Sequence, residues 1–390
     1  MRKTWVNSRV QSLKPSGIRK FFDIVAQMDD VVSLGVGEPD FHTPWHVREE
    51  GIYALEKGLT TYTSNSGLLE LRQEVSRYLE QQYGISYRPE DQVLITVGAS
   101  EAIDLAMRAV IEPGDEVLIP EPSYVSYAPC VILAGGVPIA VPTTEESEFR
   151  LTAANLEQSI TSRSKILVLP YPNNPTGAIM ESQDLAEIAK VIAKHDLLVI
   201  SDEIYSELTY GIKHVSIASI PGMYERTLVI NGFSKAFSMT GWRLGYVAGD
   251  PELIAAMTKI HQFTIMCTPT ISQYAAIEAL RNGRESVEAM RSEYDLRRKF
   301  VVHAFRKIGL DCFEPKGAFY VFPSIKSLGM SSEEFCNRLL KEERVAVVPG
   351  TAFGSCGEGH IRCSYAYSLR NLEEAMVRIG RFVHKVRQEQ

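Results

Sequence analysis

The sequence predicts an α/β fold in which a mainly parallel, mixed sheet is flanked by helices, joined to a smaller α+β domain. From about residue 92 to residue 263, short apolar runs alternate with amphipathic stretches. Such alternation is typical of parallel sheets with right-handed crossovers. After Asn282-Gly283, a long charged stretch, Arg284–Ile308, leads to a second set of strands and helices. A chain of 390 residues is also long for a single domain.

The predicted elements follow from apolar runs and from the Gly, Pro and polar residues that bound them. An N-terminal arm leads into a short amphipathic helix, Ile18–Met28, and a Gly/Pro turn at residues 35–41 precedes the helix Leu69–Tyr83. The strands of the main sheet are expected at Val93–Val97, Glu116–Ile119, Val137–Val141, Lys165–Leu169, Leu197–Ser201, Thr227–Ile230 and Leu244–Ala248. The helices between them include Ser100–Val110, Ser182–His195 and Pro251–Phe263.

The second region is expected to be smaller. Its strands are expected at Ala318–Phe322, Val345–Val348 and His360–Ser364, and its helices at Ser331–Glu342 and Leu369–Val386. This pattern predicts three parts: an arm with part of the small domain in residues 1–45, the large domain in residues 46–283, and a linking helix with the small C-terminal domain in residues 284–390.

Composition excludes several classes of protein. The net charge of −7 and the pI near 5.7 lack the basic footprint of a nucleic-acid-binding protein. No stretch approaches the 18 or so uninterrupted apolar residues of a membrane span, and the N-terminus lacks the apolar core of a secretory signal. The six cysteines have no metal-binding or disulfide spacing. We therefore expect a cytoplasmic protein without a metal site, a nucleic-acid partner or a membrane partner.

One lysine stands out. Lys235 follows the apolar run Thr227–Ile230 among small residues, and Arg243 comes eight positions later. A desolvated lysine loses its proton readily and becomes an amine nucleophile for a carbonyl group, while a planar guanidinium holds a phosphate through two parallel hydrogen bonds. An amine beside a phosphate anchor is what pyridoxal phosphate (PLP) requires. Taken alone, both residues could equally be solvated loop charges.

A second group of candidates lies where other predicted strands end. Ala99 and Ser100 open a helix after Gly98, and the free N–H groups of such a helix start suit a phosphate. Asn174 lies between two prolines that fix its backbone. Because ligands of α/β sheets gather beyond the carboxyl ends of the strands, these residues are expected to share one site with Lys235.

The end of the run Leu197–Ser201 supplies a carboxylate, Asp202, and a tyrosine three residues later, Tyr205. A buried carboxylate needs a partner. A pyridinium nitrogen would serve, since an ionised Asp keeps that nitrogen protonated, but capping of a helix N-terminus is a competing role.

In their order, these motifs resemble the class I and II aminotransferases of PLP fold type I, the aspartate aminotransferase superfamily. The likeness runs from residues 33–41 to residues 360–364, and its most specific parts are the Ser-Lys-x5-Gly-x-Arg pattern that begins at Ser234 and the Asn-Pro-Thr-Gly turn at residues 174–177. The sequence is most similar to the bacterial branch of aspartate, aromatic and PatA-like (N-acetyl-diaminopimelate) aminotransferases. Gly232 departs from the Ser found in many relatives, which puts one phosphate contact in question.

The resemblance implies a role for each candidate. Lys235 would bind PLP and act as the catalytic proton carrier, and the large domain would bind the cofactor. The remaining cofactor contacts would be Asp202 at the pyridine nitrogen, Asn174 and Tyr205 at the phenolic oxygen, Tyr124 stacked on the ring, and Ala99, Ser100, Ser234, Arg243 and, from a second subunit, Tyr62 at the phosphate. The substrate carboxylate would be bound by Arg362, Asn174 and the Gly37 backbone.

The implied activity is ping-pong transfer of the amino group of an L-amino acid, of aspartate or aromatic type, to a 2-oxo acid such as 2-oxoglutarate. The alternative is a PLP-dependent carbon–sulfur β-lyase or a related enzyme on the same fold, which would use the same Lys235 and Asp202. The resemblance also implies a homodimer. Arg19 could recognise an acidic side chain of the substrate or be a surface charge.

Overall fold

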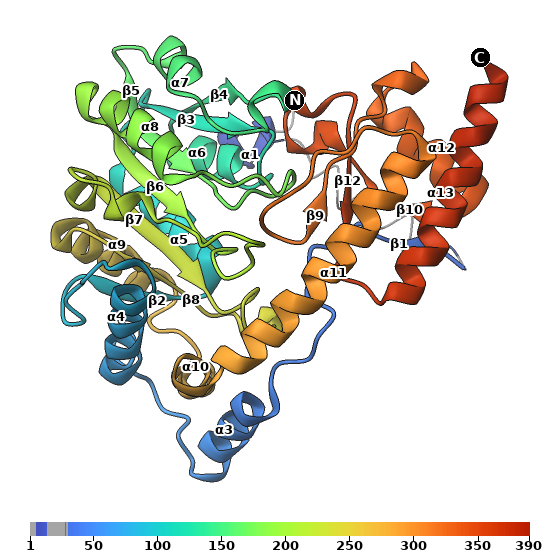
Figure 1. Cartoon of the computed structure of the whole chain (residues 1–390). Helices are drawn as coiled ribbons and strands as arrows, with labels where there is room; N and C mark the ends of the chain where they lie inside the picture. The colour runs from blue at the N-terminus through green and yellow to red at the C-terminus, as the bar shows by residue number, and fades with distance from the viewer. Residues whose placement is uncertain (1–4, 14–27, 29) are drawn as a thin grey trace.

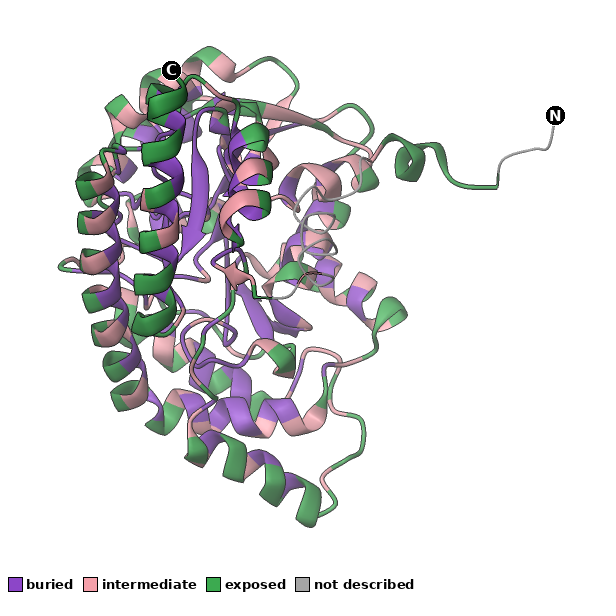
Figure 2. Ribbon diagram, turned by 90° about the vertical axis from the view of Figure 1, so that its right-hand side faces the viewer, coloured by how far each residue is buried: buried purple, intermediate pink, exposed green. Residues whose placement is uncertain are grey.

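The computed structural model describes residues 5–13, 28 and 30–390. Arg19 and the predicted helix Ile18–Met28, apart from Met28 itself, lie outside the described residues. The short helix α1 (Ser8–Ser12) has no buried residue and projects from the body of the molecule (Figure 2). No helix among the described residues is both long and apolar enough to cross a membrane.

The main sheet has seven strands in the order β2-β8-β7-β6-β5-β3-β4. They are β2 (Val93–Thr96), β3 (Glu116–Glu121), β4 (Val137–Pro142), β5 (Ser164–Leu169), β6 (Leu198–Asp202), β7 (Thr227–Gly232) and β8 (Gly245–Ala248). Strand β8 is antiparallel to both its neighbours, and the other pairs are parallel. This agrees with the predicted mainly parallel, mixed sheet, and it places the carboxyl ends of β5, β6 and β7 at one edge.

Helices cover both faces of this sheet (Figure 1). They are α5 (Gly98–Val110), α6 (Tyr127–Ala134), α7 (Ala153–Ser159), α8 (Ser182–Lys194) and α9 (Pro251–Thr264), with α3 (Trp45–Glu56), α4 (Leu69–Tyr83) and α10 (Thr270–Asn282) at the β2 side. Along β5, Ile166 and Val168 join the apolar cluster under α5 and α9, whereas Leu167 joins the cluster under α8. Successive strand residues point to opposite faces, so the sheet is buried on both sides (Figure 2).

A smaller region follows the long helix α11 (Arg284–Ile308). It contains β9 (Tyr320–Val321), β10 (Val345–Ala346), β11 (Val348–Pro349), β12 (Ile361–Ser364), α12 (Ser332–Glu343) and α13 (Leu369–Glu389). The strand β1 (Val32–Ser33) pairs with β10 (Figure 1), so residues 32–33 belong to this region although they precede the main sheet in the chain. The single strand predicted at Val345–Val348 is divided in two, because β10 pairs with β1 while β11 pairs with β12.

The first turn of α5 lies in close contact with β8. A Cβ atom at Gly245 would lie 2.5 Å from the Ala99 nitrogen and 2.6 Å from the Gly98 carbonyl carbon. Gly98 itself has a φ of 75°, which favours glycine. The absence of side chains here therefore lets the positive end of the α5 dipole approach the end of the sheet.

We expect Gly245→Ala to lower the thermal unfolding midpoint, because the added methyl group must push α5 away from β8. Overpacking of this kind typically lowers the free energy of unfolding by about 1–3 kcal/mol. Gly241→Ala is the matched control, since a Cβ at Gly241 meets no atom within 4 Å. Equal midpoints for the two variants in a thermal melt would contradict the close packing.

Candidate active site

A cavity of about 570 Å³ opens at the carboxyl ends of β5, β6 and β7. Strand β6 ends on Asp202, and Asn174 and Lys235 follow β5 and β7. The opposite wall comes from residues 35–37, Tyr320 on β9 and Arg362 on β12. The predicted site residues that line this cavity are Gly37, Ala99, Ser100, Tyr124, Asn174, Asp202, Tyr205, Ser234, Lys235, Arg243 and Arg362. Tyr62 lies apart from them on the surface, with 80% of its area exposed.

Lys235 faces this cavity as a partly buried amine. Its Nζ donates a hydrogen bond to the Gly37 carbonyl oxygen at 2.8 Å. Burial lowers the pKa of Lys235 to about 8, and the positive charges of Arg362 and Arg243 act in the same direction against the opposing Glu38. A lysine with this pKa supplies a useful fraction of neutral amine near neutral pH.

Asp202 is a carboxylate that is only 5% exposed. The Tyr127 hydroxyl donates to its Oδ2 at 2.7 Å, and the Ile204 N–H donates to its Oδ1 at 3.2 Å. Burial raises the pKa of Asp202 to about 6, and these two hydrogen bonds with the Lys235 charge limit that rise. Burial and the Asp202 charge also raise the pKa of Tyr127 well above its usual range, so its hydroxyl stays protonated and donates.

Arg362 is buried at 4% exposure, and its guanidinium has an unused hydrogen-bond donor. Its Nη1 donates to the Asn174 Oδ1 at 2.9 Å, and its Nη2 donates to the Gly35 carbonyl oxygen. The Nε has no hydrogen-bond partner among the described residues. A buried donor without a partner is costly, and a carboxylate in the cavity would satisfy it.

The start of α5 and Arg243 form an anion-binding site at the other end of the cavity. Ala99 and Ser100 lie in the first turn of α5. The Arg243 Nη1 donates to the Thr240 carbonyl oxygen at 3.1 Å, and its Nη2 lies so close to Gly98 that a Cβ there would approach it to 2.8 Å. A helix N-terminus beside a guanidinium suits a phosphate.

The departure at Gly232 has a structural reason. Gly232 pairs with Gly245 across β7 and β8. A Cβ at this position would lie 3.0 Å from the Gly245 Cα and from the Leu244 carbonyl oxygen. The close pairing of the two strands therefore favours glycine over serine here.

Taken together, the cavity fits PLP on its own geometry. It offers an amine of lowered pKa, a buried carboxylate with unused hydrogen-bond acceptor sites, and an anion-binding site, all along one cavity. Among the described residues no group of three or more His, Cys, Asp or Glu side chains is placed to hold a metal ion.

Sequence reasoning missed two tyrosines of this site. Tyr127, which binds Asp202, lies three residues after Tyr124, and the two rings meet edge to face at 5.6 Å. The available signal was the presence of a second tyrosine in the segment that follows β3 and carries Tyr124. Tyr320 lies in a short strand without any motif, and nothing in the sequence marks it as a cavity residue.

The comparisons with known proteins agree with this site. The family described as aminotransferase class I and II matches residues 29–379. The chain is 49% identical to the aspartate aminotransferase of Pyrococcus abyssi (strain GE5 / Orsay), covering 97% of this chain and 98% of that one. It is 48% identical to aromatic-amino-acid aminotransferase 2 of Thermococcus litoralis, covering 96% and 97%. The crystal structure of the aromatic aminotransferase from Pyrococcus horikoshii OT3 superposes with a TM-score of 0.90 at 48% identity, covering 95% and 99%.

Fold and cavity therefore define a PLP-dependent enzyme of fold type I, as predicted. Within that class, the chain belongs to the class I and II aminotransferases, and it transfers amino groups between small-molecule substrates. Both relatives carry aminotransferase names, which supports transamination rather than the carbon–sulfur lyase alternative.

The raised pKa of Asp202 predicts a dependence of stability on pH. Between the ordinary carboxyl pKa of about 4 and about 6, the folded protein binds more protons than the unfolded chain. Stability must therefore fall as the pH rises through this window. Asp202→Asn removes the ionisation, so the PLP-free variant should be more stable than PLP-free wild type at pH 8 by about 1–3 kcal/mol, with no difference near pH 4.

Urea unfolding midpoints of the PLP-free proteins at several pH values measure this effect. Asp196→Asn is the control, since the Asp196 side chain is 91% exposed and its ion pair with Arg226 lies at the surface. A gain for Asp202→Asn that is the same at pH 4 and pH 8 would contradict the assignment.

Proposed function

We propose that this enzyme moves the amino group of an aspartate-type or aromatic L-amino acid to 2-oxoglutarate through Lys235, Asp202 and Arg362. The supporting observation is that one cavity places an amine of lowered pKa, a buried carboxylate and a guanidinium with an unpartnered Nε together. When bound, PLP supplies an aldehyde that condenses with amines and a ring that accepts the electron pair of a deprotonated Cα.

Arg362 binds the α-carboxylate of both substrates. Its planar guanidinium suits a bidentate carboxylate, and Asn174 fixes its orientation by accepting from Nη1. The Gly37 backbone lies at the same end of the cavity, where its carbonyl oxygen accepts from Lys235. The carboxylate contact fixes the Cα–H bond relative to Lys235, which is a positioning effect on the rate.

Lys235 carries the proton. A general base works best when its pKa lies near the working pH, and the pKa of Lys235 is about 8. In this proposal its Nζ accepts the Cα proton of the donor in the first half-reaction. In the second half-reaction, after the first oxo acid has left, Nζ delivers a proton to Cα of the acceptor. Asp202 would hold the pyridine nitrogen, Tyr205 and Asn174 the phenolic oxygen, and Tyr124 the ring face. Ala99, Ser100, Ser234 and Arg243, which line the same cavity, would hold the phosphate.

The described lining holds no further cationic side chain for the second carboxylate of an acidic substrate. Its cationic side chains are Lys235, Arg243 and Arg362, and each already has a proposed partner. The remainder is largely apolar or aromatic, including Val36, Val125, Ile204, Tyr124 and Tyr320. A panel of aspartate, tyrosine and phenylalanine as donors with 2-oxoglutarate will rank the donors by kcat/KM.

Lys235→Ala should reduce transamination by at least about 10⁴-fold, the upper range for a lost acid–base group. Loss of the amine should also remove the visible absorption that PLP acquires on binding a protein lysine. Lys235→Arg is the matched variant, because it keeps a positive charge without a nucleophilic amine. A variant with wild-type turnover in a coupled oxo-acid assay would refute the role of Lys235.

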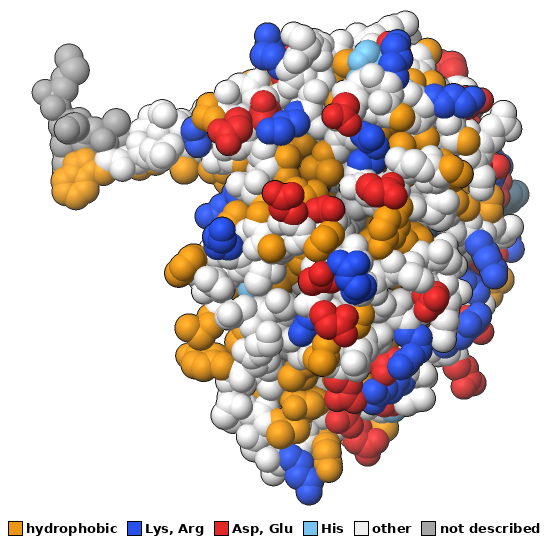
Figure 3. Space-filling model, turned by 90° about the vertical axis from the view of Figure 1, so that its left-hand side faces the viewer, with side chains coloured by type: hydrophobic (Ala, Val, Ile, Leu, Met, Phe, Trp, Pro, Cys, Tyr) orange, Lys and Arg blue, Asp and Glu red, His pale blue; other side chains and the backbone are white. Residues whose placement is uncertain are grey.

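We also propose a homodimer in which the second subunit brings Tyr62 to the phosphate. Exposed large apolar side chains gather on α3, between α3 and α4, and at and just after the end of α9, and they include Trp45, Ile52, Tyr53, Leu55, Tyr62, Phe263, Ile265 and Met266. Figure 3 shows hydrophobic side chains running along the lower part of that face, toward the end of the molecule where α3 lies. Exposed apolar surface of this kind marks interaction sites.

Two further assignments belong to this proposal. The division into residues 1–45, 46–283 and 284–390 is supported by the apolar cluster that joins Leu34 to Phe335 and Ile379. Packing also crosses these boundaries, because Tyr205 and Leu208 belong to the same cluster, while Phe322 and Val348 pack with the main sheet. A cytoplasmic location is supported by six cysteines that are all free thiols.

Tyr62→Phe should weaken PLP binding by roughly 10- to 150-fold, because a hydrogen bond to a charged group is worth roughly 1.5–3 kcal/mol. The dissociation constant of PLP, measured by fluorescence quenching, tests this directly. Tyr53→Phe is the control, as another exposed tyrosine on the same side of the molecule. Identical PLP affinity of Tyr62→Phe and wild type would exclude Tyr62 from the phosphate site.

A further inference from the structure

Tyr320 contacts two residues of the proposed site, Arg362 and Tyr205. It lies on β9 at the wall of the cavity and is 1% exposed. The Arg362 Cζ lies 4.6 Å from the centre of its ring, and its hydroxyl lies 2.8 Å from the Tyr205 hydroxyl. Gly37 packs against the same hydroxyl so closely that a Cβ there would lie 2.2 Å from it.

The ring of Tyr320 restricts where the Arg362 guanidinium can lie. A guanidinium over an aromatic face is attracted by the ring quadrupole, more strongly when the pair is desolvated. Phe353 provides a second ring, with its centre 4.8 Å from the Arg362 Cζ. With both rings in place, Nη1 still donates to Asn174, and Nε has no hydrogen-bond partner among the described residues and is free to bind a carboxylate.

The hydroxyl of Tyr320 sets the direction of the Tyr205 proton. Burial raises the pKa of both tyrosines, so each hydroxyl carries one proton. If Tyr205 donates its proton to the cofactor's phenolic oxygen, Tyr320 must donate to Tyr205. Hydrogen bonds in such a chain strengthen one another, so Tyr320 makes Tyr205 the better donor.

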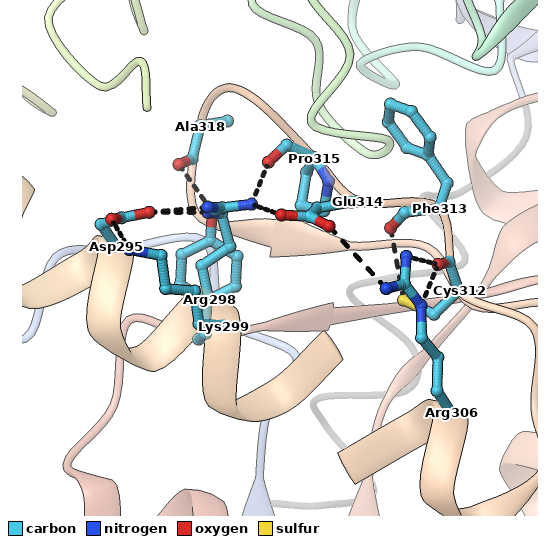
Figure 4. A network of polar contacts seen from close by, with 10 residues as sticks. Asp295, Arg298, Lys299, Arg306, Cys312, Phe313, Glu314, Pro315 and Ala318 are labelled. Atoms are coloured by element: carbon cyan, nitrogen blue, oxygen red, sulfur yellow. Dashed lines mark hydrogen bonds and ion pairs between the residues drawn. The ribbon is translucent and has the colours of Figure 1, made fainter. Parts of the chain in front are cut away.

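Contacts outside the cavity fix the segment that carries Tyr320. Arg298 on α11 binds Asp295, Glu314 and the Pro315 carbonyl oxygen, and Arg306 binds the Cys312 carbonyl oxygen (Figure 4). The same segment donates from the Lys316 and Gly317 N–H groups to the Gly177 carbonyl oxygen, at the end of the turn that presents Asn174. Tyr320 is thus held by a braced segment rather than by the cavity alone.

We propose that Tyr320 is a positioning residue that couples the carboxylate-binding Arg362 to the Tyr205 hydrogen bond at the phenolic oxygen. The inference rests on the proposed function, because it uses the roles proposed for Arg362 and Tyr205. It predicts two separable effects, one from the hydroxyl and one from the ring.

Tyr320→Phe tests the hydroxyl. The readout is the pH titration of the visible absorption of the PLP-loaded enzyme, without substrate. The phenolic oxygen would accept hydrogen bonds from two donors, Tyr205 and the protonated lysine nitrogen. The Tyr205 bond would weaken the bond from the lysine nitrogen and so favour loss of its proton. A weaker Tyr205 donor should therefore shift the midpoint upward by a few tenths of a unit, while the dissociation constant of a carboxylate inhibitor changes less than about twofold, because the ring remains.

Tyr320→Leu tests the ring. The dissociation constant of maleate, or of 3-phenylpropanoate if aromatic donors are preferred, should rise roughly tenfold in a spectral titration, because Arg362 loses the desolvated face of the ring. The KM values of donor and acceptor should rise together, with a smaller change in kcat. If Tyr320→Leu fails to fold, the Tyr320→Phe titration decides alone.

Tyr365→Phe is the matched control. Tyr365 is fully buried nearby, and its hydroxyl donates to the Ala318 carbonyl oxygen at 3.0 Å. A purely structural role for Tyr320 predicts that both Tyr→Phe variants leave the titration midpoint unchanged, and this result would overturn the inference.

Arg362→Ala distinguishes a failure of the proposed function from a failure of the role proposed for Tyr320. If it leaves the inhibitor dissociation constant unchanged, the proposed function itself fails. If Arg362→Ala weakens inhibitor binding strongly while neither Tyr320 variant has an effect, only the role of Tyr320 is refuted.

Discussion

The site depends on two groups of opposite charge that are buried at the ends of neighbouring parallel strands, at a cost to stability. Asp202 ends β6 in register with Ile230 of β7, and Lys235 lies three residues after the end of β7 at Gly232. Because the strands are parallel, both side chains emerge at the same edge of the sheet. Withdrawing a charge from water is costly, and the opposite shifts of the two pKa values, upward for Asp202 and downward for Lys235, express that cost. The apolar layers on both faces of the sheet keep water away from these two side chains and so maintain both pKa shifts.

The sheet alone does not complete the cavity. Arg362 comes from β12, and its contact with Asn174 joins residues 188 positions apart in the chain. That contact depends on the turn at Asn174, which is itself held by the backbone of residues 316 and 317. The second region therefore supplies both the guanidinium and part of the support for its partner. Any shift of β9 and β12 relative to the sheet would alter the carboxylate end of the cavity while leaving the Lys235 end in place.

The sequence was sufficient where local pattern determines the outcome. The helices Leu69–Tyr83 and Arg284–Ile308 have the predicted bounds, since each ends at a glycine in the left-handed conformation. Asp202 and Asn174 were predicted from their positions at strand ends. The division of Val345–Val348 could not be predicted, because it depends on two different partner strands. Tyr320 was missed for a related reason: its contacts with Arg362 and Tyr205 join three distant segments, and no local pattern records them.

Glu203 shows what distinguishes a ligand-binding carboxylate from a structural one. It follows Asp202 directly and is more deeply buried, at 0% exposure against 5%. Glu203 lies just beyond the end of β6 and meets three donors: Ser201 at 2.8 Å, Ser216 at 2.7 Å and His214 at 2.9 Å. Asp202 receives two. A carboxylate offers about four acceptor sites, so Asp202 retains capacity on the cavity side for an N–H group. Asp202, and not the more deeply buried Glu203, is therefore identified as the ligand-binding carboxylate, because its unused hydrogen-bond acceptor sites face the cavity.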